Sequence, residues 1–138
     1  MSTYFETPEV LDLRDLAAKA REYLETWQDE HGDREEREEA KYALEIIGNF
    51  MGELGYASRT TYEGSIEALE SYAEDEPTAI RDDYFTQYAQ ELAADIGAID
   101  PKASWPLNRI DWEAAAEDLL IDYNEADLEG ESYYIRAF

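Results

Sequence analysis

The chain has 138 residues and carries 35 acidic against 11 basic side chains, for a formal net charge of −24, and it contains no cysteine. The missing cysteines exclude a disulfide framework, a thiol nucleophile and a thiolate metal site. The charge lies far beyond the magnitude of about 2 to 8 that keeps a small domain soluble. Because a field of this sign repels nucleic acid and attracts basic clefts, the expected partner is a basic protein rather than nucleic acid.

A hydrophobic content of 44%, with 11 tyrosines, 4 phenylalanines and 3 tryptophans, is enough for a core and argues against disorder. We therefore expect residues 1–138 to form a single domain. No apolar stretch approaches the roughly 18 residues of a membrane span. The first residues, MSTYFETPEV, lack the basic and apolar pattern of a signal peptide. These features predict no membrane contact and a cytoplasmic location.

Two amphipathic helices are predicted in residues 1–60, where apolar side chains recur at helical spacing. The first begins at Asp12 and is stopped by Gly32, and the second begins at Asp33 and ends at Gly55. The short joint between them predicts an antiparallel helical hairpin.

A third helix is predicted from about Thr61 to Ala73. It ends before Pro77, since the residue before a proline is driven out of the α region. The outer side of this helix carries only acids, at spacings of four, three and four residues that place them in one row. This row consists of Glu63, Glu67, Glu70 and Glu74.

A fourth helix is predicted in the stretch DDYFTQYAQELAADIG. Asp82 or Asp83 is expected to cap its N-terminus, Gly97 to close it, and Ile96 to point inward. The segment IDPKASWPL that follows contains two prolines, and we expect it to be an ordered loop pinned by Trp105.

The clearest helix starts at Asp111, whose carboxylate can accept N–H groups of the first turn, and its apolar stripe continues to Tyr123. No Lys or Arg occurs from Ile110 to Tyr134. The six acids from Asp111 to Glu125 would span about 21 Å of one helix, or about one charge per 3.5 Å, close to the roughly 3.4 Å between phosphates along a DNA strand. Like charges four residues apart oppose a helix by roughly 0.2 to 0.5 kcal/mol per pair, so the arrangement suggests a use, although a charge run is usually just a solvated face.

The C-terminal stretch ADLEGESYYIRAF predicts a short β-hairpin that turns at Glu129 and Gly130. Two strands alone are marginal, so the hairpin should pack on the helices through Tyr134, or through Tyr133 and Ile135. The expected fold class is therefore mainly α (α+β), with about five helices in a compact bundle and a short C-terminal β-hairpin.

The charge is divided unevenly along the chain. Residues 1–60 hold 15 acids and 7 bases, for −8, whereas residues 61–138 hold 20 acids and 4 bases, for −16. We interpret residues 1–60 as a helical hairpin scaffold and residues 61–138 as the acidic, partner-binding part of the domain.

The sequence lacks the catalytic residues that most enzyme classes require. His31 is the single histidine and makes neither a catalytic triad nor a zinc site, so a surface imidazole is expected. No Gly-rich phosphate loop is present. A calcium loop aligned on Gly130 would place Arg136 where the bidentate carboxylate belongs. With 35 acids a glycosidase-like carboxylate pair remains open, but we expect no enzyme, no catalytic residue, no metal and no cofactor.

The stretch WPLNRIDWEAAAEDLLIDYNEADLEGESYYIR, preceded by DDYFTQYAQELAADIG, resembles the C-terminal part of ArdA-type antirestriction proteins and related phage proteins. The matching features are the IDWEAAAEDL helix, the DY that follows it and the turn at Gly130 before YYIR. The resemblance covers about the last 60 residues. It implies an elongated protein that imitates the shape and phosphate charge of B-form DNA and blocks type I restriction-modification enzymes by occupying their DNA groove.

The sequence thus predicts a DNA-mimic inhibitor that occupies the DNA-binding cleft of a host defence enzyme in the host cytoplasm, with type I restriction-modification as the leading target. The alternatives are an anti-CRISPR or other anti-defence DNA mimic, and an acidic halophilic-type or adaptor protein with a basic partner. A homodimer is compatible with each. The residues expected to stand in for phosphates are Glu63, Glu67, Glu70, Glu74, Asp75, Glu76, Asp82, Asp83, Glu91, Asp95, Glu113, Glu117, Asp118, Asp122, Glu125, Asp127 and Glu129.

Overall fold

The computed structural model describes residues 4–56 and 61–136. Within these residues the chain forms five α-helices and a four-stranded antiparallel sheet of order β1-β2-β4-β3. The fold is mainly α (α+β), as expected. The helices are α1 (Leu13–Gln28), α2 (Arg34–Met51), α3 (Tyr62–Asp75), α4 (Phe85–Asp95) and α5 (Trp112–Leu119). The strands are β1 (Val10–Asp12), β2 (Thr78–Arg81), β3 (Tyr123–Leu128) and β4 (Glu131–Arg136).

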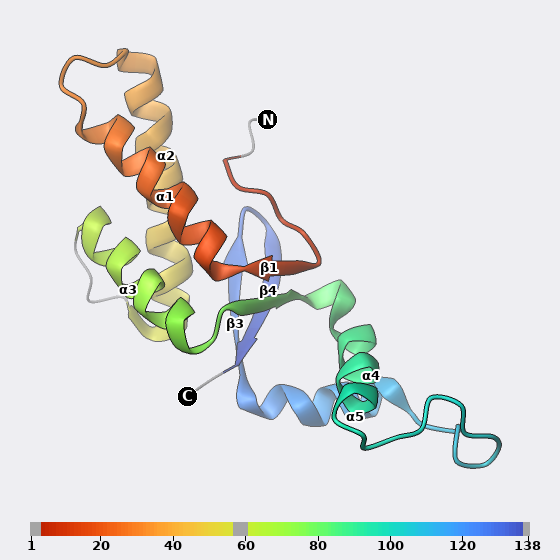
Figure 1. Cartoon of the computed structure of the whole chain (residues 1–138). Helices are drawn as coiled ribbons and strands as arrows, with labels where there is room; N and C mark the ends of the chain where they lie inside the picture. Colours follow the sequence, from red (N-terminus) through yellow and green to blue (C-terminus); the bar gives the residue numbers. More distant parts are fainter. Residues whose placement is uncertain (1–3, 57–60, 137–138) are drawn as a thin grey trace.

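The sheet separates two groups of helices, and the molecule is elongated (Figure 1). Helices α1, α2 and α3 lie together on one side, and α4 and α5 lie on the other. The tip of the α1–α2 hairpin forms one end of the molecule and the segment between α4 and α5 forms the other. Each group therefore packs on its own face of the sheet that they share.

The larger core lies between α1, α2, α3 and one face of the sheet. Asp12 caps α1, since its carboxylate accepts the backbone N–H of Arg14 at 2.9 Å, which confirms the predicted start. Sequence spacing also identified the buried stripe of α2, which consists of Ala40, Ala43, Leu44, Ile47, Phe50 and Met51. A π-helical turn, η1 (Gly52–Tyr56), follows α2, and Gly55 takes the positive φ of 99° that the predicted helix end needs.

The smaller core lies on the opposite face of the sheet and is built around Phe85. The Phe85 ring centroid lies 5.1 Å from Tyr123 and from Tyr134, both edge-on, and 5.7 Å from Tyr88. Such aromatic contacts add about 0.5 to 1.5 kcal/mol per pair beyond the burial of area. This cluster therefore fixes α4 against β3 and β4.

The C-terminal hairpin turns where it was predicted, with φ of 49° at Glu129 and 89° at Gly130. Its strand β4 uses both of its faces, because side chains alternate across a strand. Tyr133 and Ile135 are fully buried in the larger core, and Tyr134 packs in the smaller one. Both of the alternative packing modes considered for the hairpin are thus realised at once.

Strands β1 and β2 were not predicted. β2 pairs with β4 through Ala79↔Ile135 and Ile80↔Tyr134, and β1 pairs with β2 through Leu11↔Ala79. Helix α1 also ends at Gln28, before the predicted stop at Gly32, so the joint to α2 is longer than expected.

Three further expectations at the α4 end are wrong. Neither Asp82 nor Asp83 caps the helix with its side chain, and a short 3-10 helix, η2 (Asp82–Tyr84), precedes α4 instead. The side chain of Ile96 is 69% exposed rather than inward. Trp105 is 73% exposed and does not pin the loop, since most of its side chain faces solvent instead of packing on a core.

Candidate partner-binding surface

The acids of α5 and of the short 3-10 helix after it, η3 (Leu120–Asp122), form an exposed anionic group. Asp111 caps α5 as predicted, and its Oδ1 accepts the N–H of Ala114 at 3.1 Å. Four exposed acids follow on this segment, namely Glu113, Glu117, Asp118 and Asp122. None of them belongs to an ion pair among the residues that the structure describes.

The expected row of six carboxylates on one continuous helix is wrong. Helix α5 ends at Leu119, and Tyr123 already pairs with Arg136 in the β3–β4 hairpin. Glu125 and Asp127 consequently lie on β3, exposed, in strand rather than helix geometry. The reason is tertiary, because Tyr123 packs edge-on against Phe85 and draws the chain into the sheet.

The C-termini of α3, α4 and α5 carry acids where cations would be favourable. The last turns of α3, α4 and α5 contain no basic residue, although Asp75, Asp95 and Asp118 lie in them. A helix C-terminus has a partial negative charge, and an anion there costs typically about 0.3 to 1 kcal/mol. These acids therefore work against the helices that carry them.

In the folded protein, a cation from another helix lies against the acid row of α3. The guanidinium of Arg21, on α1, makes two hydrogen bonds to the Glu70 carboxylate, at 2.8 and 3.1 Å, and approaches Glu63 at 3.9 Å. The Arg21 side chain hydrogen-bonds to Glu70 and so lowers the pKa of that carboxyl. Glu67 and Glu74 are exposed and remain outside the ion pairs of the described residues. Half of the predicted row thus already has a cation.

Glu129 serves the fold. Its two carboxylate oxygens accept the backbone N–H groups of Tyr4 and Phe5, each at 2.9 Å, so it holds the N-terminal segment across the hairpin turn. Phe5 is thereby placed in the larger core, where its side chain is 3% exposed. A half-buried carboxylate with two donors has little capacity left for a partner.

Asp83 and Glu91 are also engaged within the chain. Asp83 accepts two hydrogen bonds from the Arg81 guanidinium, at 2.7 and 3.2 Å, which lower the pKa of its carboxyl. Glu91 accepts the hydroxyl of Tyr84 at 2.9 Å, and this bond raises the pKa of the tyrosine. Both acids remain exposed, so their outer oxygens still contribute to the surface field.

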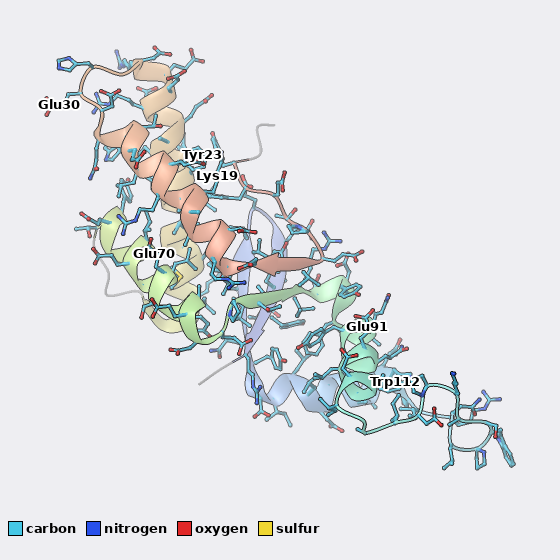
Figure 2. All side chains as sticks on the ribbon, in the orientation of Figure 1. Lys19, Tyr23, Glu30, Glu70, Glu91 and Trp112 are labelled. Carbon is cyan, nitrogen blue, oxygen red and sulfur yellow. The ribbon has the colours of Figure 1, made fainter. Side chains whose placement is uncertain are left out.

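The predicted acids differ in exposure. Most are exposed, namely Glu63, Glu67, Glu74, Asp75, Asp82, Asp83, Glu91, Asp95, Glu113, Glu117, Asp118, Asp122, Glu125 and Asp127. Glu70, Glu76 and Glu129 are half-buried. Figure 2 shows carboxylates over the whole length of the molecule, with Glu30 at the hairpin tip and Glu91 on α4. The negative surface is therefore long, and the stretch from Trp112 to Asp122 contributes four exposed acids to it, none in an ion pair of the described residues.

Sequence reasoning missed the roles of Glu53 and Arg81. The Glu53 carboxylate accepts the backbone N–H of Asp127 in β3. Arg81, 20% exposed, bonds to Asp83 and to the Thr7 carbonyl. Each of them contacts a residue that is distant in the sequence, so local spacing could not predict its role.

His31 is exposed in the joint between α1 and α2, where it was placed. Among residues 4–56 and 61–136, no group of three or more metal-binding side chains is arranged to hold an ion. In the same part of the chain, no helix combines the length and the apolar character needed to span a membrane. The chain matches no family model, and no curated protein or solved structure matches it.

Proposed function

We propose that this protein is a DNA-mimic inhibitor that occupies the DNA-binding cleft of a defence enzyme, with type I restriction-modification enzymes as the leading target. The observation that supports this most is the segment from Trp112 to Asp122, which exposes four acids and has no cation of the described chain in an ion pair with them. The like charges of Glu113 and Glu117, four residues apart, and Asp118 in the last turn oppose the helix, which favours a role in binding over a role in stability.

Binding would depend on the same electrostatics as DNA recognition, with the carboxylates of this protein in the place of the DNA phosphates. The basic cleft exchanges its condensed anions or its DNA for carboxylates, so affinity falls steeply as salt rises. The net charge of −24 would also accelerate association at low ionic strength, because long-range attraction steers the encounter. The mechanism is occlusion of the cleft, without catalysis.

The test is binding to a purified type I restriction-modification enzyme, followed by competition with duplex DNA and by a cleavage assay. DNA that displaces the protein, together with inhibited cleavage, supports the proposal. Binding that duplex DNA does not displace would overturn it. A CRISPR effector complex assayed in parallel decides between the two kinds of defence target.

The variant that tests the surface replaces four acids, as E113Q/E117Q/D118N/D122N. It should remain folded and should inhibit less. Its matched control removes four exposed charges from the other end of the molecule, as E30Q/E35Q/E36Q/E39Q, and changes the net charge equally. Equal loss in both variants would assign the effect to total charge, and unchanged inhibition by the first variant would remove α5 as the contact.

An acidic adaptor is the second candidate, and the early end of α5 at Leu119 favours it. Without a straight six-carboxylate row, a basic protein can be recognised by charge alone. Such an adaptor would bind its partner outside the DNA cleft, so duplex DNA would not compete. A halophilic-type protein would show no specific partner and only stabilisation by salt.

A further inference from the structure

Residues at or next to the C-terminal ends of α3, α4 and α5 line one groove of about 260 Å³. Glu76, which follows α3, Ile96, which follows α4, and Leu119, which ends α5, all line it. Because each helix C-terminus carries a partial negative charge, the nearby helix ends add to the negative charge of the carboxylates that line the groove. The lining residues run from Glu76 to Arg136 in the sequence, and the fold brings them together.

The groove combines apolar walls with carboxylates at its mouth. Tyr88 and Tyr123 line it with their hydroxyls 3.5 Å apart, and Leu92 adds an aliphatic surface. Burial raises the pKa of Tyr123 well above its ordinary value, so the phenol stays neutral. Half-buried Glu76 and exposed Asp122 supply the formal negative charge.

The last turns of α3, α4 and α5 provide no cation to compensate this negative charge. Arg136, on β4, is the one basic side chain that lines the groove in the part of the chain that the structure describes. It makes no ion pair with Glu76 or Asp122 among those residues. The two lining carboxylates thus exceed the one lining guanidinium in formal charge.

We propose that this groove receives an arginine side chain of the basic partner. An arginine has an aliphatic stem that suits the leucine and tyrosine walls and a planar cation that stacks on aromatic rings and pairs with carboxylates. The volume fits a side chain rather than a metabolite, since small-molecule sites take roughly 300 to 1,000 Å³. The proposal rests on the proposed function in requiring a basic partner, and it names one anchor of that contact.

The groove can be tested with small probes, apart from any partner. L-argininamide is titrated into the ¹⁵N-labelled protein, and L-citrullinamide, which keeps the α-amino group but has a neutral urea in place of the guanidinium, serves as the control probe. We expect amide shifts localised at Leu92, Ile96, Leu119 and Asp122 with argininamide and not with citrullinamide. Shifts spread over all acidic surfaces, or equal shifts with both probes, would overturn the proposal.

Two variants test the groove with opposite signs. E76Q/D122N should weaken argininamide binding about tenfold, as expected for the loss of charge-assisted hydrogen bonds, whereas E36Q/E39Q on α2 removes the same charge and should change it less than about twofold. R136Q removes the competing cation and should tighten binding, an outcome that unfolding cannot produce. Equal weakening in both double variants, or weaker binding by R136Q, would contradict the assignment.

The two proposals fail in distinguishable ways. Argininamide binding in the groove, combined with partner binding that DNA does not displace, would support the arginine-binding groove and contradict the DNA-mimic function. Inhibition competed by DNA, combined with no localised argininamide shifts, would keep the DNA mimic and remove the groove.

Discussion

The Arg21 guanidinium determines how much of the α3 acid row faces a partner. It bonds to Glu70 at 2.8 Å, with side chains 36% and 40% exposed. Exposed ion pairs contribute only about 0.2 to 1 kcal/mol, so this contact orders two helices more than it stabilises them. Arg21 on α1 therefore reduces the number of α3 carboxylates that are free to pair with a partner.

We predict that E70Q lowers the free energy of unfolding by roughly 0.2 to 1 kcal/mol at neutral pH. Arg21 lowers the pKa of Glu70 below its ordinary value of 4.5. The contribution is therefore fully present above pH 4.5 and is lost as the pH falls through the folded-state pKa. Urea unfolding at several pH values should show the difference from the wild type shrinking below pH 4.5. The control E67Q alters an exposed neighbour without an ion pair, and a similar loss there would contradict the assignment to Arg21.

Glu129 was expected to face a partner, but it holds the N-terminal segment. We predict that E129A destabilises the protein by roughly 1.5 to 3 kcal/mol, since hydrogen bonds to a charged group are lost, and speeds amide exchange at Tyr4 and Phe5. E129Q retains one acceptor oxygen and should lose less. Unchanged exchange at these two amides in E129A would show that other contacts hold the segment.

At the scale of elements, local signals located the helices and the hairpin because they lie within a few neighbouring residues. Asp12, Asp111 and Gly130 each mark a boundary by their own chemistry. Strands β1 and β2 have only three and four residues, too few to show a period of two, and their pairing joins distant segments. The same limit applies to the surface, since neither Arg21 beside Glu70 nor the groove at Tyr88 follows from local spacing.

The prediction of where α5 ends was wrong for a related reason. Leu119, Leu120 and Tyr123 continue the helical stripe in sequence, yet Tyr123 belongs to β3. A spacing that suits a helix also suits a 3-10 turn entering a strand. Packing of Tyr123 on Phe85 decides between them, and no window of sequence contains both residues.

Helix α5 offers a test of whether its charge opposes its fold. Glu113 lies in the first turn, where the helix dipole favours an anion, and Asp118 lies in the last turn, where it does not. We predict that D118N is more stable than E113Q by roughly 0.5 to 1 kcal/mol. Urea unfolding at low salt measures this, and molar salt should reduce the difference. Equal stability at low salt would contradict the dipole argument.

At the scale of the molecule, one sheet carries two cores of unequal size. The core under α4 and α5 contains Ile80, Phe85, Ala89 and Ala116 as its fully buried members, whereas the other core draws on three helices and the whole sheet. Regions with few buried apolar contacts open at lower free energy than the global transition. The half that holds the candidate groove is therefore the less stable half.

We predict that amides of α4 and α5 exchange through a local opening of lower free energy than amides of α2 at Leu44 and Ile47. Native-state hydrogen exchange at increasing urea measures both, and the α4–α5 amides should show the smaller dependence on urea. Convergence of all amides on one global opening would show instead that the two cores unfold as a unit.

Strand β3 forms an outer edge of the sheet, and this edge is guarded. Glu53 occupies the N–H of Asp127, η1 lies against the strand, and Glu125 and Asp127 are exposed on it. A strand from a neighbouring copy would have to displace a carboxylate and bring its own backbone beside two like charges, which is how natural sheets avoid edge-to-edge growth. The same anions that suit a basic cleft thus also deprive crowded copies of a template for fibres.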